Sequence, residues 1–155
     1  MKTRRPFAIN VLLFLLLFLS LGALFGGGVL IIDSSGDLFQ MPVIILQNSP
    51  FNNFLIPGLF LFIVLGVLPA LVFYSLLKRP QWSWVNALNV YSDMYWAWTF
   101  TLYIGFALII WISVQTLVIN SVHFVHTAYM LLGILIISLA LLPSVRQSYF
   151  QSGQQ

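Results

Sequence analysis

The chain has 155 residues, of which 61% are hydrophobic and only 6% are Lys, Arg, Asp or Glu. Soluble domains are about one quarter charged, so this composition, with a mean hydropathy of +1.01, indicates an integral membrane protein. Four membrane spans would use nearly the whole length, which excludes a separate soluble catalytic domain. The chain contains no cysteine, which excludes disulfides, thiolate nucleophiles and thiol redox chemistry.

Residues 7–32 form the first apolar run and predict the first span. As a helix this run would be about 39 Å long, whereas the hydrocarbon core of a bilayer is about 30 Å thick. The helix must therefore tilt, or its outer end must depart from helical structure, and Gly26, Gly27 and Gly28 favour a loosened or closely packed outer end. The basic start also fits a signal peptide, but the run exceeds a hydrophobic region of about 7 to 15 residues and no A-x-A site follows it. We expect the run to be retained as a span.

The next stretch predicts an exit from the membrane. Residues 33–37 read Asp-Ser-Ser-Gly-Asp, in which Asp and Ser can bond to the local backbone and Gly36 can adopt a positive φ, so we expect a turn. Residues 38–48 are apolar but too short to span a bilayer, and Pro42 opposes a long helix. We expect this segment to lie on the bundle or in the membrane interface.

Residues 54–77 predict the second span. Ser49 and Pro50 have the pattern of a helix start, with the Ser hydroxyl as N-cap and Pro at the first helical position. Pro57 and Pro69 lie within the apolar run, and each removes one backbone donor. We therefore expect kinks or local breaks in this helix.

Residues 81–95 follow Lys78 and Arg79 and are rich in Trp and Tyr, a composition typical of the headgroup level of a membrane. We expect a short interfacial helix in this segment. Asp93 lies just before the third span, where it would either cap the helix or pair with a basic residue, and capping is favoured.

Residues 98–119 and 123–142 predict the third and fourth spans. Their connection is very short, which predicts an antiparallel hairpin. Pro143 then ends the fourth span. The predicted fold is all-α: one domain, a polytopic membrane protein built as an antiparallel four-helix transmembrane bundle.

Charged residues indicate the orientation of the bundle. Basic residues precede the first span and follow the second and the fourth, whereas acidic residues lie between the first and second: Lys2, Arg4 and Arg5; Lys78 and Arg79; Arg146; and Asp33 with Asp37. By the positive-inside rule both termini face the cytoplasm, in the inner (plasma) membrane. The sequence shows no charge within a span, which opposes an ion-coupled pump.

Two candidate sites lie at the predicted outer end. His123 and His126 share one helix face, and with Asp33 and Asp37 they make a candidate set of zinc ligands. Three alternatives stay open for the histidines: a proton relay, a pH sensor, or imidazoles that bond to the backbone or to water.

The second candidate is a pocket for a lipid or an apolar molecule. Trp111 and Gln115 are four residues apart, so they point the same way and offer an aromatic wall and an amide, with His126 at similar depth. The alternative is that the polar groups form interhelical hydrogen bonds that fix the packing. Gly22 and Gly26 form a GxxxG pattern that allows close contact between helices, within the bundle or in a dimer.

A resemblance supports the membrane setting. The stretch GGGVLIIDSSG, followed by MP, SPF, FLIPGLFLF and VLG, resembles bacterial four-span membrane proteins of uncharacterised function, over about residues 26–66. This resemblance implies a bacterial inner membrane and no particular activity. The four-span layout is also similar to that of DoxX-like proteins, at the level of architecture only.

These features favour a non-enzymatic membrane protein, either an accessory subunit or a binder of lipid or of a small apolar ligand. A small transporter or channel, and a metal-dependent enzyme at the outer face, are the alternatives. No catalytic residue and no cofactor is predicted, because motifs such as GxSxG, HExxH and glycine-rich phosphate loops do not occur. Expected partners are membrane lipids and either a protein partner or a second copy of the chain, without nucleic acid.

Overall fold

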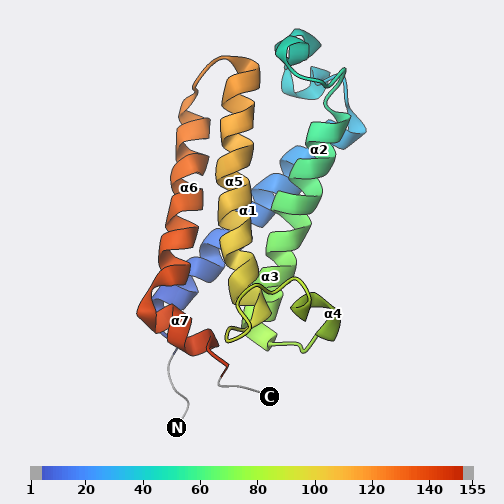
Figure 1. Ribbon diagram of the computed structural model, residues 1–155. Helices are drawn as coiled ribbons and strands as arrows, with labels where there is room; N and C mark the ends of the chain where they lie inside the picture. Colours follow the sequence, from blue (N-terminus) through green and yellow to red (C-terminus); the bar gives the residue numbers. More distant parts are fainter. Residues whose placement is uncertain (1–4, 152–155) are drawn as a thin grey trace.

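The computed structural model describes residues 5–151, which form a bundle of long helices without strands (Figure 1). Four helices are long and apolar enough to cross a membrane: Phe7–Ile32, Leu55–Lys78, Trp96–Ile119 and Phe124–Leu141. Each boundary lies within two residues of the predicted one, since a charge-free apolar run of this length is a strong signal. The predicted all-α, four-helix membrane fold is confirmed.

The helices alternate in direction and pack as neighbours. Helix α5 (Trp96–Ile119) and helix α6 (Phe124–Leu141) form the predicted antiparallel hairpin, and helix α1 (Phe7–Ile32) is inclined across them (Figure 1). The second span consists of α2 (Leu55–Phe62), a π-helical turn η3 (Ile63–Val67) and α3 (Leu68–Lys78). We call the end of the bundle that carries Arg5, Lys78, Arg79 and Arg146 the basic end, and the opposite end, which carries residues 33–54, the far end.

Glycines allow α1 and α2 to touch along their backbones. A Cβ atom at Gly27 would lie 2.6 Å from the backbone nitrogen of Phe62 and 2.8 Å from the carbonyl oxygen of Gly58. No side chain fits in this space. Because α1 stays helical to Ile32, its glycines serve close packing, and the alternative of a loosened end is wrong.

The second span departs from α-helical geometry just before Pro69. This proline cannot donate to the carbonyl of Leu65, and its ring would clash with that carbonyl in a regular α-helix. The wider turn of η3 accommodates it, and Ser20 of α1 donates a hydrogen bond of 2.8 Å to the carbonyl oxygen of Gly66 there. The predicted break is thus found at Pro69. Pro57 lies in the first turn of α2, where backbone N–H groups have no helical partner in any case, and it causes no break.

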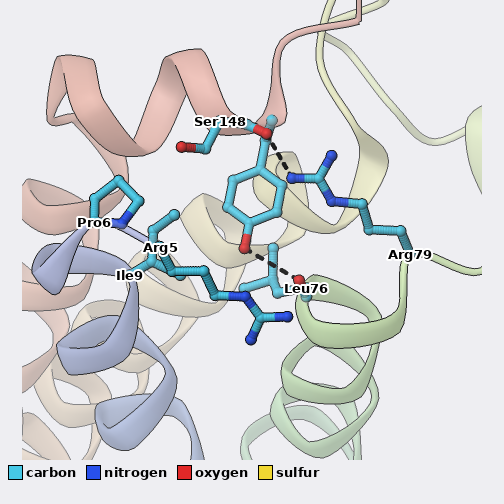
Figure 2. A pocket seen from close by; sticks show the side chains of 7 residues that line it. Arg5, Pro6, Ile9, Leu76, Arg79 and Ser148 are labelled. Atoms are coloured by element: carbon cyan, nitrogen blue, oxygen red, sulfur yellow. Dashed lines mark hydrogen bonds between the residues drawn. The ribbon is translucent and has the colours of Figure 1, made fainter. Parts of the chain in front are cut away.

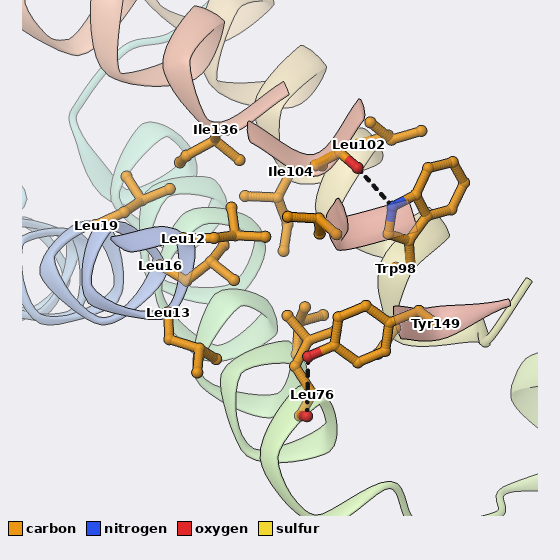
Figure 3. Close-up of a cluster of buried hydrophobic side chains, with 14 of the residues drawn as sticks. Leu12, Leu13, Leu16, Leu19, Leu76, Trp98, Leu102, Ile104, Ile136 and Tyr149 are labelled. Carbon is orange, nitrogen blue, oxygen red and sulfur yellow. Dashed lines mark hydrogen bonds between the residues drawn. The ribbon is translucent and has the colours of Figure 1, made fainter. Parts of the chain in front are cut away.

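The core is apolar and consists of buried side chains from α1, the second span, α5 and α6. Its most buried members include Leu12, Leu16, Leu19, Ile104 and Ile136 (Figure 3). Trp98 lies at the basic end of this core and donates from its indole nitrogen to the carbonyl oxygen of Ala140 at 2.8 Å, which ties α5 to α6. Burial of the large apolar part of Trp98 and this hydrogen bond together stabilise the base of the hairpin.

The basic end contains two short helices. Helix α4 (Ser83–Asn86) is the short helix predicted among the aromatic residues, whereas helix α7 (Pro143–Tyr149) was not predicted. Pro143 ends α6, as expected, but it also occupies the first position of α7, where its fixed φ favours a helix start.

Backbone hydrogen bonds fasten the segment after α7 to the segment before α5. The amide of Tyr95 donates to the carbonyl oxygen of Tyr149, and the amide of Gln151 donates to that of Asp93, each at 2.8 Å. The predicted capping role of Asp93 is wrong, because Tyr95 is the N-cap of α5 and no side chain bonds there. Asn89 organises this loop instead, since its amide donates to the Met94 carbonyl oxygen and its Oδ1 accepts from Thr99.

At the far end, residues 33–37 form the predicted turn, with Gly36 at a φ of 83°. Two 3₁₀ segments follow, η1 (Asp37–Phe39) and η2 (Val43–Asn48), and η2 packs against α5 as expected for a segment lying on the bundle. Leu46 of η2 is buried in a small cluster with Leu30 and Phe54.

The predicted helix start at Ser49 and Pro50 is wrong. The Ser49 hydroxyl donates to the carbonyl oxygen of Leu46 and accepts from the amide of Phe51, so it closes a local turn instead of capping a helix. Helix α2 begins at Leu55 with Phe54 as N-cap, and the Phe54 amide donates to the carbonyl oxygen of Ser34 at 2.9 Å. This long-range bond ties Phe54 to the turn after α1, and the helix begins only after it.

Candidate functional site

A cavity of about 230 Å³ lies between α1, the second span, α5 and α6, towards the far end of the bundle. Trp111, Gln115 and His126 all line it, so the structure brings together the three residues proposed as ligand contacts. The other lining residues are mostly apolar or small: Leu19, Gly22, Ala23, Gly26, Leu61, Leu65, Leu108, Ile112, Val125 and Tyr129.

Small residues of α1 create much of this space. Gly22, Ala23 and Gly26 face the larger side chains of α5 and α6 across the cavity. A Cβ atom at Gly22 would lie 2.9 Å from the hydroxyl oxygen of Tyr129, whereas one at Gly26 would make only an ordinary contact of 3.5 Å with Leu61. The GxxxG pattern therefore lines the cavity within one chain.

Trp111 forms an aromatic wall. Its ring stacks on Phe60 of α2, with centroids 4.6 Å apart and planes inclined by 25°. Its indole nitrogen is buried, and within residues 5–151 it has no hydrogen-bond partner. An interhelical hydrogen bond, the alternative explanation for a polar group here, is thus not made by Trp111. An unpaired buried N–H costs free energy, so an acceptor reaching it would be stabilised.

Trp111 and Gln115 also line a separate, smaller cavity of about 70 Å³, which is bounded on other sides by α2 and by the segment of residues 41–46. Pro57 and Phe54 lie on its far side. The two side chains of α5 therefore stand at the junction of both spaces, where a ligand could contact either.

The two histidines cap α6. The Nδ1 atom of His126 accepts a hydrogen bond of 3.2 Å from the amide of His123, and the His123 side chain interacts reciprocally at the helix start. The Nε2 atom of His123 lies 2.9 Å from the Ser121 hydroxyl. In the neutral ring of His126 an accepting Nδ1 places the proton on Nε2, which leaves one donor. Among the roles considered for these histidines, the structure shows an imidazole that bonds to the backbone, at His126.

Asp33 and Asp37 belong to the turn after α1. The Ser35 hydroxyl lies within hydrogen-bond distance of both carboxylates and can donate to either one, and the Leu38 amide donates to Asp33 at 2.7 Å. The bond from Ser35, and then that from Leu38, lower the pKa of Asp33 below its ordinary value. Both bonds favour the ionised carboxylate, so the turn is best formed when Asp33 is charged.

The metal hypothesis required His123, His126, Asp33 and Asp37 to converge. Within the described part of the chain no group of three or more such residues is arranged to hold a metal ion, so the histidines and the aspartates are two separate pairs. The aspartates bond to Ser35 and Leu38, and the histidines bond at the start of α6.

Sequence reasoning missed Tyr129, which lines the cavity one turn after His126 on the same face of α6. The spacing of three residues was the available signal. The sequence-based prediction treated Arg5 and Arg79 only as markers of membrane orientation, although both line a pocket at the basic end. Comparisons with protein-family models, with curated proteins and with solved structures found no match to this chain.

Proposed function

We propose that this multi-pass membrane protein is a non-enzymatic binder of a small apolar molecule or of a lipid chain segment. The observation that carries this proposal is the cavity lined by Trp111, Gln115 and His126. We further propose that the protein resides in the inner (plasma) membrane, with the basic end in the cytoplasm, in accordance with the positive-inside rule.

The size of the cavity sets the size of its occupant. At about 230 Å³ it exceeds the cavity of about 150 Å³ that is known to bind benzene, but it is smaller than the 300 to 1,000 Å³ or so typical of drug-sized ligands. A single ring or a short alkyl segment fits this volume better than a complete lipid. The binder therefore takes either a small molecule or one part of a larger one.

The polarity of the cavity lining indicates the chemical character of the ligand. Leucine, isoleucine, alanine and glycine make up most of the lining, whereas polar atoms come from Gln115, His126, Tyr129 and Trp111. Such a lining suits an apolar body that carries one hydroxyl or carbonyl group. The amide and the imidazole offer that group a hydrogen bond, which is valuable in a region without water.

A transport path has less support from the geometry. It would need the prolines of the second span and Gln115 to line one continuous route, but Pro69 lines neither cavity while Pro57 lines the smaller one. Towards the basic end the bundle is filled by fully buried Leu12 and Leu16. A cavity that is closed towards the basic end is the arrangement expected of a binding protein.

Photolabelling tests the proposal. The full chain in nanodiscs is exposed to a diazirine derivative of octanol, and labelled peptides are mapped by mass spectrometry. We expect saturable labelling of α1 and α5 around the cavity, reduced by excess octanol. Gly26→Leu should abolish most of this labelling, because the new side chain occupies the cavity while its Cβ makes only an ordinary contact.

Gly28→Leu is the matched control. Gly28 lies on the same helix, its Cβ would be 3.8 Å from Phe62, and it does not line the cavity. Saturable labelling should persist in this variant, and thermal unfolding should confirm that both variants fold. Labelling confined to exposed residues such as Phe14 and Phe18, without saturation, would show that the probe only samples the lipid-facing surface and would overturn the proposal.

A further inference from the structure

A second pocket, of about 450 Å³, opens at the basic end where three elements meet. The start of α1 contributes Pro6 and Ile9, preceded by Arg5; the end of α3 contributes Leu76, followed by Arg79; and α7 contributes Ser148 and Tyr149. Figure 2 shows the side chains of Arg5 and Arg79 reaching this space from different elements. Residues far apart in the sequence thus build one basic pocket.

The lining of this pocket contains two guanidinium groups and no carboxylate. The whole chain has only three acidic residues, and Asp33 and Asp37 are at the far end. The third, Asp93, precedes α5 and does not line the pocket. A pocket with this charge attracts an anion.

Each arginine is held in place by a carbonyl oxygen. Arg79 donates to the carbonyl oxygen of Ser148 at 2.6 Å, and its guanidinium carbon lies 4.9 Å from the centre of the Tyr149 ring (Figure 2). Arg5 donates to the carbonyl oxygen of Leu77 at 3.3 Å. Each of these hydrogen bonds uses a single N–H group, so both guanidinium groups keep further donors for a ligand.

Tyr149 forms a rigid wall between the arginines and the core. It is buried, and its hydroxyl donates to the carbonyl oxygen of Leu76 at 3.1 Å. Burial raises the pKa of Tyr149, while the charges of Arg79 and Arg5 act in the opposite direction. Arg5 and Arg79 therefore both line the pocket beside Tyr149 and both contribute positive potential there.

We propose that this pocket binds a phosphate group. Guanidinium groups match phosphate oxygens in geometry as well as charge. A lipid phosphate is one source, since the pocket lies at the end of membrane-spanning helices and has Ile9 and Leu76 beside its arginines. Free phosphate is the other. This site is separate from the cavity near the far end and does not depend on its function.

Binding measurements on the full chain in detergent distinguish the two sources. The probes are a short-chain phosphatidylglycerol, a diacylglycerol with the same chains, and inorganic phosphate, each followed by native mass spectrometry or thermophoresis. We expect the phosphatidylglycerol to bind more tightly than the diacylglycerol. Arg5→Gln and Arg79→Gln should each weaken its binding by about tenfold, the loss typical of one charge-assisted hydrogen bond.

Arg146→Gln is the matched control, because Arg146 is an exposed residue of α7 at the same end but does not line the pocket. Its effect should stay below about twofold, as for a screened surface charge. Arg79→Lys tests whether binding needs the planar guanidinium group with its several N–H donors. This variant should also weaken binding, because lysine keeps the positive charge but not that geometry. Thermal unfolding checks each variant, and Arg5→Gln serves alone if the Arg79 variants do not fold.

The outcomes divide clearly. Tighter binding of phosphatidylglycerol that depends on Arg5 and Arg79 supports a lipid phosphate. Binding of inorganic phosphate with the same dependence, and with no gain from acyl chains, supports free phosphate. Equal binding of diacylglycerol, or an equal loss in Arg146→Gln, would overturn the phosphate site.

Discussion

At the scale of single residues, Tyr95 shows how the basic end is stabilised. The side chain is buried just before α5, and its hydroxyl donates to the carbonyl oxygen of Pro80 at 2.8 Å. Burial, the largest cause, raises the pKa of Tyr95 to about 12 despite the nearby Arg79. The folded state therefore prefers the neutral phenol.

The sign of the resulting pH dependence follows from linkage. A group whose pKa is higher in the folded state stabilises the fold fully below its unfolded pKa, here 10.0, and this contribution is lost as pH rises towards about 12. Thermal unfolding in detergent should accordingly show falling stability above pH 10 for the natural chain. Tyr95→Phe should be less stable near neutral pH by about 1 kcal/mol, the typical net value of one hydrogen bond, and its decline above pH 10 should be smaller.

Absorbance at alkaline pH provides the direct check. The absorbance of the natural chain minus that of Tyr95→Phe should show the titration of one tyrosine, with a midpoint well above pH 10. A difference spectrum with a midpoint near pH 10 would show that Tyr95 is exposed to water and would contradict the structure.

Residue contacts were most directly predictable from sequence where the partners lie on one helix. The spacing of Trp111 and Gln115 placed both on one face, and the structure finds both at one cavity. The pairing of Tyr149 with Leu76 and Arg79 could not be predicted, because these residues are about 70 positions apart and only the packed bundle brings them together. Local spacing carries no information on such contacts.

At the scale of elements, packing of α1 against α2 depends on the absence of a side chain at Gly27. We predict that Gly27→Ala lowers thermal stability in detergent, by roughly 1 to 3 kcal/mol as for other overpacked cores. The added Cβ would come within 2.6 Å of backbone atoms of α2, which cannot move aside as a flexible side chain could. The two helices would have to separate.

Gly28→Ala is the control on the adjacent residue. Its Cβ would meet only the ring of Phe62 at 3.8 Å, an ordinary contact, and alanine favours helix formation over glycine. This variant should be as stable as the natural chain or slightly more so. Equal losses in both variants would point to the glycine-rich sequence itself and away from the contact with α2.

Element boundaries followed from the sequence where hydropathy changes sharply, and failed where tertiary contacts decide them. The start of α2 moved from Pro50 to Leu55, because Ser49 and Phe54 use their hydrogen bonds on the far-end loop. Helix α7 was missed because it is short and polar, and its place depends on contacts of Tyr149 with α3. Propensity is a weak guide for such short elements.

At the scale of the whole molecule, the two ends of the bundle differ in charge. Among the described residues Arg5, Lys78, Arg79 and Arg146 lie at the basic end, and Asp33 and Asp37 occupy the loop at the far end. Orientation in the membrane therefore depends on a few side chains in short segments. The same asymmetry concentrates the proposed phosphate site at the basic end and leaves the proposed apolar cavity nearer the far end.

The orientation can be measured cleanly because the chain contains no cysteine, so a single introduced thiol is the only reactive one. We predict that Asn52→Cys, in the exposed loop at the far end, is labelled by a membrane-impermeant maleimide in intact cells. Asn86→Cys in α4 and Gln147→Cys in α7, both exposed at the basic end, should react only after the membrane is permeabilised.

Full labelling of all three variants in detergent controls for differences in thiol reactivity. Because Asn86 and Gln147 are separated by the hairpin of α5 and α6, equal protection of both is the result expected of a hairpin that crosses the membrane twice. Labelling of Gln147→Cys but not of Asn52→Cys in intact cells would mean that the bundle is inverted. The basic pocket would then face away from the cytoplasm, and a lipid phosphate bound there would have to come from the outer leaflet.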